Sequence, residues 1–239
     1  MIALHSLLPL PVVVPLTGAA LAPLAARFTR RAPLVVALVA LLGAAGILLA
    51  MAPGVYGGHL LVEFIGHAPP VRGHVLGIAF AADAWGLTFA LVTALLGTVL
   101  ALYTLSELSG LGKRELGGFS ALFLLLCAAL IGAALTADLF NLFVWFEVAA
   151  IASYALTGFF LERPIALEAA FKILVLTTIA GFAIFIGAGL IYARHGALDF
   201  AQIHNALAAH TYPADLAALG LLTAGFATKA GLVPFHGWL

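Results

Sequence analysis

Long apolar runs separated by short polar stretches dominate the chain from its first residues to its last. A helix that crosses a bilayer needs about 20 consecutive apolar residues, and seven runs approach or exceed that length. We expect seven membrane-spanning helices over residues 6–26, 34–51, 84–103, 119–136, 139–160, 167–192 and 216–239. The pattern therefore predicts an all-α protein that crosses the membrane several times, with short connections between most of its spans.

Two longer connections carry patterns of their own. The connection over residues 52–83 holds two short apolar runs, 60–65 and 75–80, on either side of a proline pair. Such runs separated by turn-forming residues are typical of a β-hairpin, and we expect one on the outer membrane face. The connection over residues 193–215 spaces its apolar side chains for a short amphipathic surface helix. Those side chains are Leu198, Phe200, Ile203 and Leu207.

The composition agrees with a membrane protein and excludes several other classes. Hydrophobic residues make up 64% of the 239 residues and the four charged types only 8%, whereas a soluble domain carries about 25% charged residues. Ten basic residues balance ten acidic ones, so we expect no basic surface for nucleic acid. The single cysteine, Cys127, excludes an internal disulfide.

The basic residues of the connections predict the orientation of the spans. Lys and Arg are enriched on the cytoplasmic side of membrane proteins. Most of the basic residues outside the expected spans lie on one set of alternating connections, which we therefore expect to be cytoplasmic, with the N-terminus outside. This set is Arg27, Arg30, Arg31, Lys113, Arg114 and Arg163; Arg72 and Arg194 lie on the other. No Lys or Arg precedes the first apolar run, and that run is too long for a signal peptide, so we expect no cleavable signal.

Glu147 lies near the middle of the fifth expected span. Ionisable groups at membrane depth are costly and usually face a protein interior or water. Burial favours the neutral acid, whereas a nearby ammonium favours the carboxylate, and a group under both influences is able to change its protonation state during a transport cycle. We therefore expect Glu147 to carry protons. The alternative is a structural, protonated glutamate that hydrogen-bonds a neighbouring helix.

Lys229 lies deep in the apolar part of the seventh expected span, and Gly231 and Pro234 follow it closely. Proline interrupts a helix, and a broken helix beside a buried charge is how transporters build ion sites at the membrane midplane. The alternative is a lysine that extends to the membrane surface. His236 is the next candidate for proton transfer, because imidazole changes charge near neutral pH. The alternative for His236, which we consider nearly equal, is a histidine without a transport role in a connection at the membrane interface.

Other charged residues near the spans have two explanations each. Glu168 and Lys172 are four residues apart at the start of the sixth span, so on a helix they share a face and can pair. Either they form a supporting ion pair, or Lys172 belongs to the proton path. Asp83 and Asp138 precede expected helices, and we favour helix N-caps over transport roles for both.

Motifs for enzymatic chemistry are missing from the sequence. It contains no GxxxxGK[ST], GxSxG, CxxC or HExxH pattern. The histidines other than His236 are scattered without the convergent spacing of metal ligands. We therefore expect no catalytic site, no cofactor and no metal site in this chain.

Two segments resemble a known family of membrane subunits. The first is TADLFNLFVWFEV at 136–148 with the following ASYAL at 152–156, and the second is KAGLVPFHGWL at 229–239. Both are similar to the proton-conducting antiporter-like subunits of complex I (NADH:quinone oxidoreductase), of Mrp-type sodium/proton antiporters and of membrane-bound hydrogenases. The DLFNLFVWFEV form looks most like the D-type Mrp subunit.

The resemblance implies roles for individual residues. Glu147 matches the glutamate of the family's fifth helix, Lys229 the lysine of its broken seventh helix, and Lys172 the basic residue of its sixth. In the family these groups form a hydrated polar axis, in which the Glu–Lys pair modulates protonation of the lysine. The resemblance also implies a hairpin on the outer face, in agreement with the expectation from the apolar runs.

The resemblance has consequences for the whole chain. Family members are much longer and contain two inverted five-helix repeats, so this chain resembles their N-terminal half. On that basis residues 1–117 are a three-helix region with the hairpin, and residues 118–239 are a first, incomplete repeat. We expect partner membrane subunits, including a chain that completes the second repeat, in the cell (inner) membrane.

Three functions are compatible with these features. The leading one is a proton-translocating subunit of a multisubunit cation/proton antiporter, with Na+ as one candidate for the coupled cation. The second is a proton-pumping membrane subunit of a complex I-like oxidoreductase or membrane-bound hydrogenase, whose redox chemistry would reside in partners. The third is a structural membrane subunit whose charges no longer act.

Overall fold

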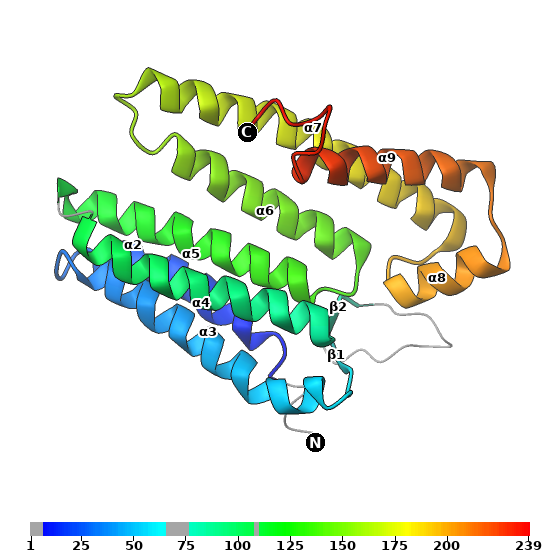
Figure 1. Cartoon of the computed structure of the whole chain (residues 1–239), viewed down its shortest axis with the longest axis horizontal. Coiled ribbons are helices and arrows are strands. Elements are labelled where there is room, and N and C mark those ends of the chain that lie inside the picture. Colours follow the sequence, from blue (N-terminus) through cyan, green and yellow to red (C-terminus); the bar gives the residue numbers. More distant parts are fainter. Residues whose placement is uncertain (1–6, 66–76, 108–109) are drawn as a thin grey trace. The chain divides into compact units, whose positions relative to one another are not determined.

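The computed structural model describes residues 7–65, 77–107 and 110–239. Within these residues the chain forms eight helices and two short strands (Figure 1). They are α2 Leu10–Ala25, α3 Ala32–Tyr56, β1 Leu61–Phe64, β2 Ala79–Ala82, α4 Ala84–Glu107, α5 Lys113–Leu135, α6 Leu139–Thr157, α7 Pro164–His195, α8 Phe200–Ala209 and α9 Pro213–Lys229.

Five of these helices, α3 to α7, are long and apolar enough to cross a membrane. The helix α2 is apolar but shorter, at 16 residues. The prediction of an all-α protein with several membrane spans is therefore confirmed, and this is a multi-pass integral membrane protein.

The seventh predicted span needs correction. We expected it to start near residue 216, to be broken near Gly231 and Pro234, and to reach the chain end. The structure confirms the break, because α9 begins at Pro213 and ends at Lys229, but no helix follows it among the described residues 230–239. The residues after Lys229 form turns instead of helix. The physical reason is the left-handed backbone of Gly231, at φ 66°, which closes the helix.

Both patterns in the longer connections are confirmed as elements. The strands β1 and β2 pair in a two-stranded sheet, slightly displaced from the predicted runs; Val75 and Leu76 lie outside the described residues. The predicted amphipathic helix is α8. Asp199 is its N-cap residue, and the Asp199 side chain accepts hydrogen bonds from the backbone N–H groups of Ala201 and Gln202, which stabilises the start of the helix.

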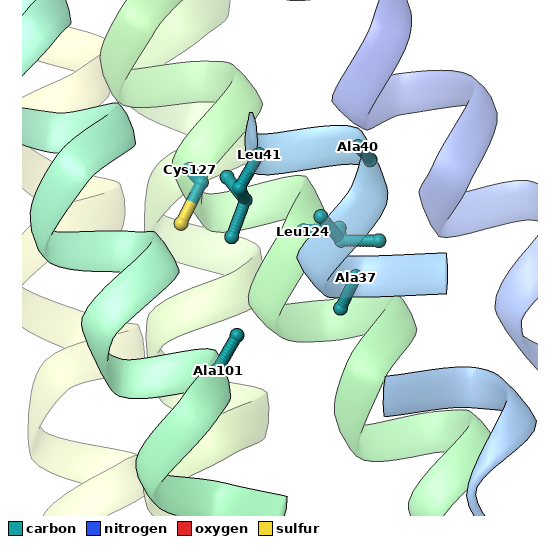
Figure 2. Close-up of a cluster of buried hydrophobic side chains, with 6 residues drawn as sticks. All are labelled: Ala37, Ala40, Leu41, Ala101, Leu124 and Cys127. Carbon is teal, nitrogen blue, oxygen red and sulfur yellow. The ribbon is translucent and has the colours of Figure 1, made fainter. Parts of the chain in front are cut away.

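The chain divides into two compact units. The first comprises residues 1–63 and 81–135, and it contains α2, α3, α4 and α5. In this unit α2 packs against α5 and α3, and α4 packs against α3 and α5. Figure 2 shows part of its core, where small side chains of α3 and α4 meet larger ones of α3 and α5. Small residues let helices approach closely in a membrane.

The second unit comprises residues 64–80 and 136–239 and contains α6, α7, α8 and α9. Its helix α7 packs against both α6 and α9, and α8 contacts α7. Backbone hydrogen bonds tie the start of α6 to the start of α8: Leu139 donates to Leu198 (2.8 Å), and Phe200 donates to Ala137 (2.9 Å). These units are defined by contacts in space. The division at residue 117 into a three-helix region and a first repeat, which the resemblance implies, stays a prediction.

Candidate functional site

The start of α6 is fixed by a buried polar cluster. The carboxylate of Asp138 accepts a hydrogen bond from the backbone N–H of Asn141 (2.7 Å), so the predicted N-cap role is confirmed. The side-chain amide of Asn141 donates to Thr136 Oγ1 (2.9 Å). Burial raises the pKa of Asp138 above its usual value, although backbone N–H groups act in the opposite direction. This cluster anchors the helix about 13 Å before Glu147, at 1.5 Å per residue.

Glu147 and Lys229 meet although they are far apart in the sequence. Lys229 Nζ donates to Glu147 Oε1 at 2.9 Å. The Lys229 side chain is 9% exposed and that of Glu147 is 29% exposed. Both residues belong to the second unit, and their contact joins the middle of α6 to the last residue of α9. The pairing is the central geometric finding at this site.

The backbone and a ring of α6 add to the surroundings of the Lys229 ammonium. Its Nζ also donates to the carbonyl oxygen of Phe146 at 3.4 Å. The same atom lies 6.0 Å from the centre of the Phe146 ring, within the range of a cation–π contact. The ammonium is therefore oriented by three groups on two successive residues of α6.

The end of α9 places Lys229 at its position. Gly231 N donates to Thr228 O (3.1 Å), and Leu232 N donates to Ala227 O (2.9 Å). With Gly231 in a left-handed conformation, this is the Schellman arrangement that closes many helices. Trp238 Nε1 donates to the same Thr228 carbonyl at 2.8 Å, so the segment after the helix folds back onto it.

The helix α7 forms a third side of the site. The Glu147 carboxyl group packs directly against Gly181, so closely that a Cβ on this residue would lie 2.7 Å from Glu147 Cδ. Sequence reasoning missed Gly181. A glycine within an apolar helix is a weak signal, and nothing local in the sequence connects it with a residue on another helix.

Glu168 and Lys172 pair with each other, as expected for one helical face. Lys172 Nζ lies 2.6 Å from Glu168 Oε1, and the two side chains are exposed, at 53% for Lys172 and 64% for Glu168. Lys172 precedes Gly181 by nine residues, which is about 13 Å along α7. The structure thus brings this pair together but leaves it well separated from Glu147, and a role for Lys172 in proton transfer stays a prediction.

His236 lies in the turns after α9, with an exposed side chain. Its backbone carbonyl accepts a hydrogen bond from Leu239 N (3.1 Å). An apolar cleft of about 290 Å³ lies beside this segment, between α7 and α9, and Thr228, Pro234 and Phe235 are among its lining residues. The role of His236 as a proton acceptor stays a prediction.

A second buried pair was missed by sequence reasoning. His195 Nε2 lies 3.0 Å from Asp215 Oδ1, and both side chains are 5% exposed. The backbone N–H of Tyr212 donates to the Asp215 carboxylate (2.7 Å). In the sequence, His195 is one of several scattered histidines. Nothing in the linear pattern shows that the chain returns through α8 and brings Asp215 of α9 back to the end of α7.

A carboxylate beside a largely buried ammonium is an arrangement that can transfer protons. A carboxylate and an ammonium in a poorly solvated interior each favour the charged form of the other. Protonation of such a carboxylate therefore makes it easier for the ammonium to release a proton. Among the described residues, no group of three His, Cys, Asp or Glu side chains is arranged to hold a metal ion.

Comparison with known proteins identifies relatives of both units. Residues 136–239 match the family described as NADH:quinone oxidoreductase/Mrp antiporter, TM. The chain is 34% identical over 231 residues to NADH-quinone oxidoreductase subunit N of Desulforudis audaxviator, covering 96% of this chain and 44% of the relative. It is 32% identical over 164 residues to the D-type subunit of the Na(+)/H(+) antiporter of Bacillus subtilis, covering 68% of this chain and 33% of the relative.

Solved structures agree with the sequence relatives. The Mrp complex from Dietzia sp. contains a chain that is 30% identical, with a TM-score of 0.83 over 99% of this chain and 43% of that chain. This chain therefore spans less than half the length of each of these proteins. The resemblance carried by the segments around Glu147 and Lys229 is confirmed: the chain belongs to the family of antiporter-like membrane subunits of NADH:quinone oxidoreductases and Mrp antiporters.

Proposed function

We propose that this chain is part of a proton-translocating, antiporter-like subunit, and that the Glu147–Lys229 pair is its proton-transfer site. The observation that carries the proposal is the 2.9 Å contact between a carboxylate in the middle of a membrane helix and an ammonium at the end of another. Ionisable groups kept at such depth are by default functional groups.

The proposed cycle conserves protons and charge. In the paired state Glu147 is a carboxylate and Lys229 an ammonium. A proton arriving at Glu147 forms the neutral acid and removes the negative charge that stabilises the ammonium. Lys229 then releases one proton to an acceptor, for which His236 is the candidate, and becomes a neutral amine. Transfer of the proton from Glu147 to Lys229 restores the ion pair, so that one proton has entered and one has left.

Replacing Glu147 by glutamine tests the proposal directly. Glutamine keeps the volume of the side chain but loses its charge, so Glu147→Gln should abolish proton pumping while the complex still assembles. Pumping would be followed with a pH-sensitive dye in membrane vesicles that hold the whole complex. The matched control is Glu162→Gln, because Glu162 is an exposed glutamate in the connection between α6 and α7, and it should pump like the wild type. Normal pumping by Glu147→Gln would reduce this carboxyl to a structural group and favour a structural membrane subunit.

The force that drives the protons defines a second candidate function. The match to an NADH-quinone oxidoreductase subunit supports a redox-driven pump, whereas the match to an antiporter subunit supports exchange of protons for Na+. The same vesicles distinguish the two. Proton uptake driven by an imposed Na+ gradient without a reductant supports the antiporter, and uptake that requires NADH or another electron donor supports the oxidoreductase.

The remaining proposals concern the setting of the chain. We propose that it works with other membrane subunits, including a chain segment that completes the second repeat, in the cell (inner) membrane. The solved relative in the Mrp complex supports the first part. The proton path would continue from the pair to His236 on one side and to Lys172, supported by Glu168, on the other.

A further inference from the structure

We infer that Gly181 is a positioning residue for the proton-transfer site: the space left by its missing side chain is where the Glu147 carboxylate meets Lys229. This inference rests on the proposed function and extends the site onto α7. It concerns how the ion pair is held in place, which is a question separate from whether the pair moves protons.

The geometry links Gly181 to one particular oxygen atom. Gly181 is buried on α7. A Cβ on it would lie 3.2 Å from Glu147 Oε2 and still closer to Glu147 Oε1. Oε1 is the atom that accepts the hydrogen bond from Lys229 Nζ. A methyl group at this position would therefore displace the oxygen on which the ion pair depends.

Two glycines at the contact between α7 and α9 have a different role. A Cβ on Gly187 would lie 2.8 Å from Leu222 Cγ and 3.1 Å from the Ala218 carbonyl oxygen, and a Cβ on Gly225 would lie 2.8 Å from the Ala180 carbonyl oxygen. These two glycines allow α7 and α9 to approach each other closely, which is the usual function of small residues between membrane helices.

Substitution of Gly181 is informative because the group that its side chain would meet is the flexible end of Glu147. A backbone carbonyl cannot move without shifting its helix, but the carboxyl end of a glutamate can turn to another rotamer at small cost. Gly181→Ala should therefore leave the packing of α7 intact and change the position of the Glu147 carboxylate. The substitution acts on the site and spares the fold.

The first measurement is proton pumping in vesicles that hold the whole complex. Gly181→Ala should lower pumping by about tenfold or more, as expected when a hydrogen bond between charged groups is lost. The matched control is Gly189→Ala, on the same helix, where an added Cβ meets no atom within 4 Å. This control should pump like the wild type.

The second measurement detects the ion pair without any transport. Dicyclohexylcarbodiimide reacts with neutral carboxyl groups in apolar surroundings and spares ionised ones. Glu147 should therefore be protected while it is paired and should become reactive once it loses its cation and takes up a proton. Labelling of the peptide that contains Glu147 would be measured by mass spectrometry. Lys229→Ala, which breaks the pair from the other side, sets the level expected for Gly181→Ala, and Glu147→Gln sets the background.

A third variant separates positioning from general damage. Aspartate is one methylene shorter than glutamate, so Glu147→Asp withdraws the carboxylate from α7. In that background Gly181→Ala should cause little further loss of pumping, because the two substitutions act on one contact and are not additive. If the double variant lost pumping by the product of the two single losses, the inference would be overturned. It would also be overturned if Gly181→Ala failed to assemble and adding Glu147→Asp did not restore assembly.

The two hypotheses fail in different ways. Wild-type labelling of Glu147 in Gly181→Ala overturns the positioning role, whatever pumping shows. Increased labelling in Gly181→Ala together with normal pumping by Glu147→Gln supports the positioning role and overturns the proposed function.

Discussion

At the scale of single residues, the two lysine–glutamate pairs of the second unit differ in their surroundings. Glu168 and Lys172 are more than half exposed, and water screens the attraction in pairs of this kind, so they contribute little to stability. The Lys229 ammonium is largely buried and has further contacts with Phe146, and charges in poorly solvated surroundings interact far more strongly. The protonation states of Glu147 and Lys229 are therefore the ones expected to depend on each other.

Arginine at position 229 tests whether Lys229 releases a proton. Arginine keeps the positive charge and is able to pair with Glu147, but its guanidinium does not deprotonate in proteins. Lys229→Arg should assemble normally and lose most proton pumping in vesicles. Lys113→Arg, an exposed lysine at the start of α5, is the control and should pump like the wild type. Full pumping by Lys229→Arg would mean that the charge at this position is sufficient and that no proton leaves it.

The sequence predicted which charged residues matter but not what holds them. Glu147 and Lys229 stand out because a charge within a long apolar run is visible from the sequence alone. Gly181 and the His195–Asp215 pair do not stand out in this way, because their significance lies in contacts between helices. Contacts of this kind depend on how α7 packs against α6 and α9, and a single sequence does not specify that packing.

At the scale of elements, apolar length predicted where helices exist and was less accurate about where they end. The predicted spans correspond to α2 through α7 and α9, but the last one was extended to residue 239. Hydropathy counts apolar side chains, and the segment after Lys229 remains apolar. Its helix ends because of backbone hydrogen bonds around Gly231, which apolar length does not reveal.

The closure of α9 can be tested at Gly231. A side chain at a left-handed position costs about 1–2 kcal/mol, so Gly231→Ala should lower the thermal stability of the complex and speed hydrogen exchange over residues 226–232. The control is Gly220→Ala within α9, where an added Cβ meets no atom within 4 Å. Alanine in a helix interior is favoured over glycine by about 0.5–1 kcal/mol, so this control should be neutral or stabilising. Equal behaviour of the two variants would contradict the proposed closure.

At the scale of the whole molecule, the chain consists of two compact helical units and spans 44% of its NADH-quinone oxidoreductase relative. Composition and apolar runs were sufficient to predict a polytopic membrane protein, because the bilayer limits the possible architectures to a few. The orientation of the spans follows from the basic residues of the connections and remains a prediction.

Cysteine labelling from outside the cell tests this orientation. The native Cys127 is buried and should not react, so single cysteines can be added at His59 and Gly110, which are both exposed. With the N-terminus outside, a membrane-impermeant maleimide should modify His59→Cys and spare Gly110→Cys until the membrane is permeabilised. The opposite pattern would reverse the assigned topology.

The closure of α9 also affects how the pair responds to a proton. Lys229 is the last residue of α9, and the carboxyl end of a helix carries a partial negative charge that favours cations. When Glu147 becomes neutral in the proposed cycle, the ammonium loses the carboxylate charge but keeps the helix end and the Phe146 carbonyl oxygen as sources of negative potential. The helix end therefore contributes a part of the negative potential at Nζ that does not depend on Glu147 and that persists through every step of the proposed cycle.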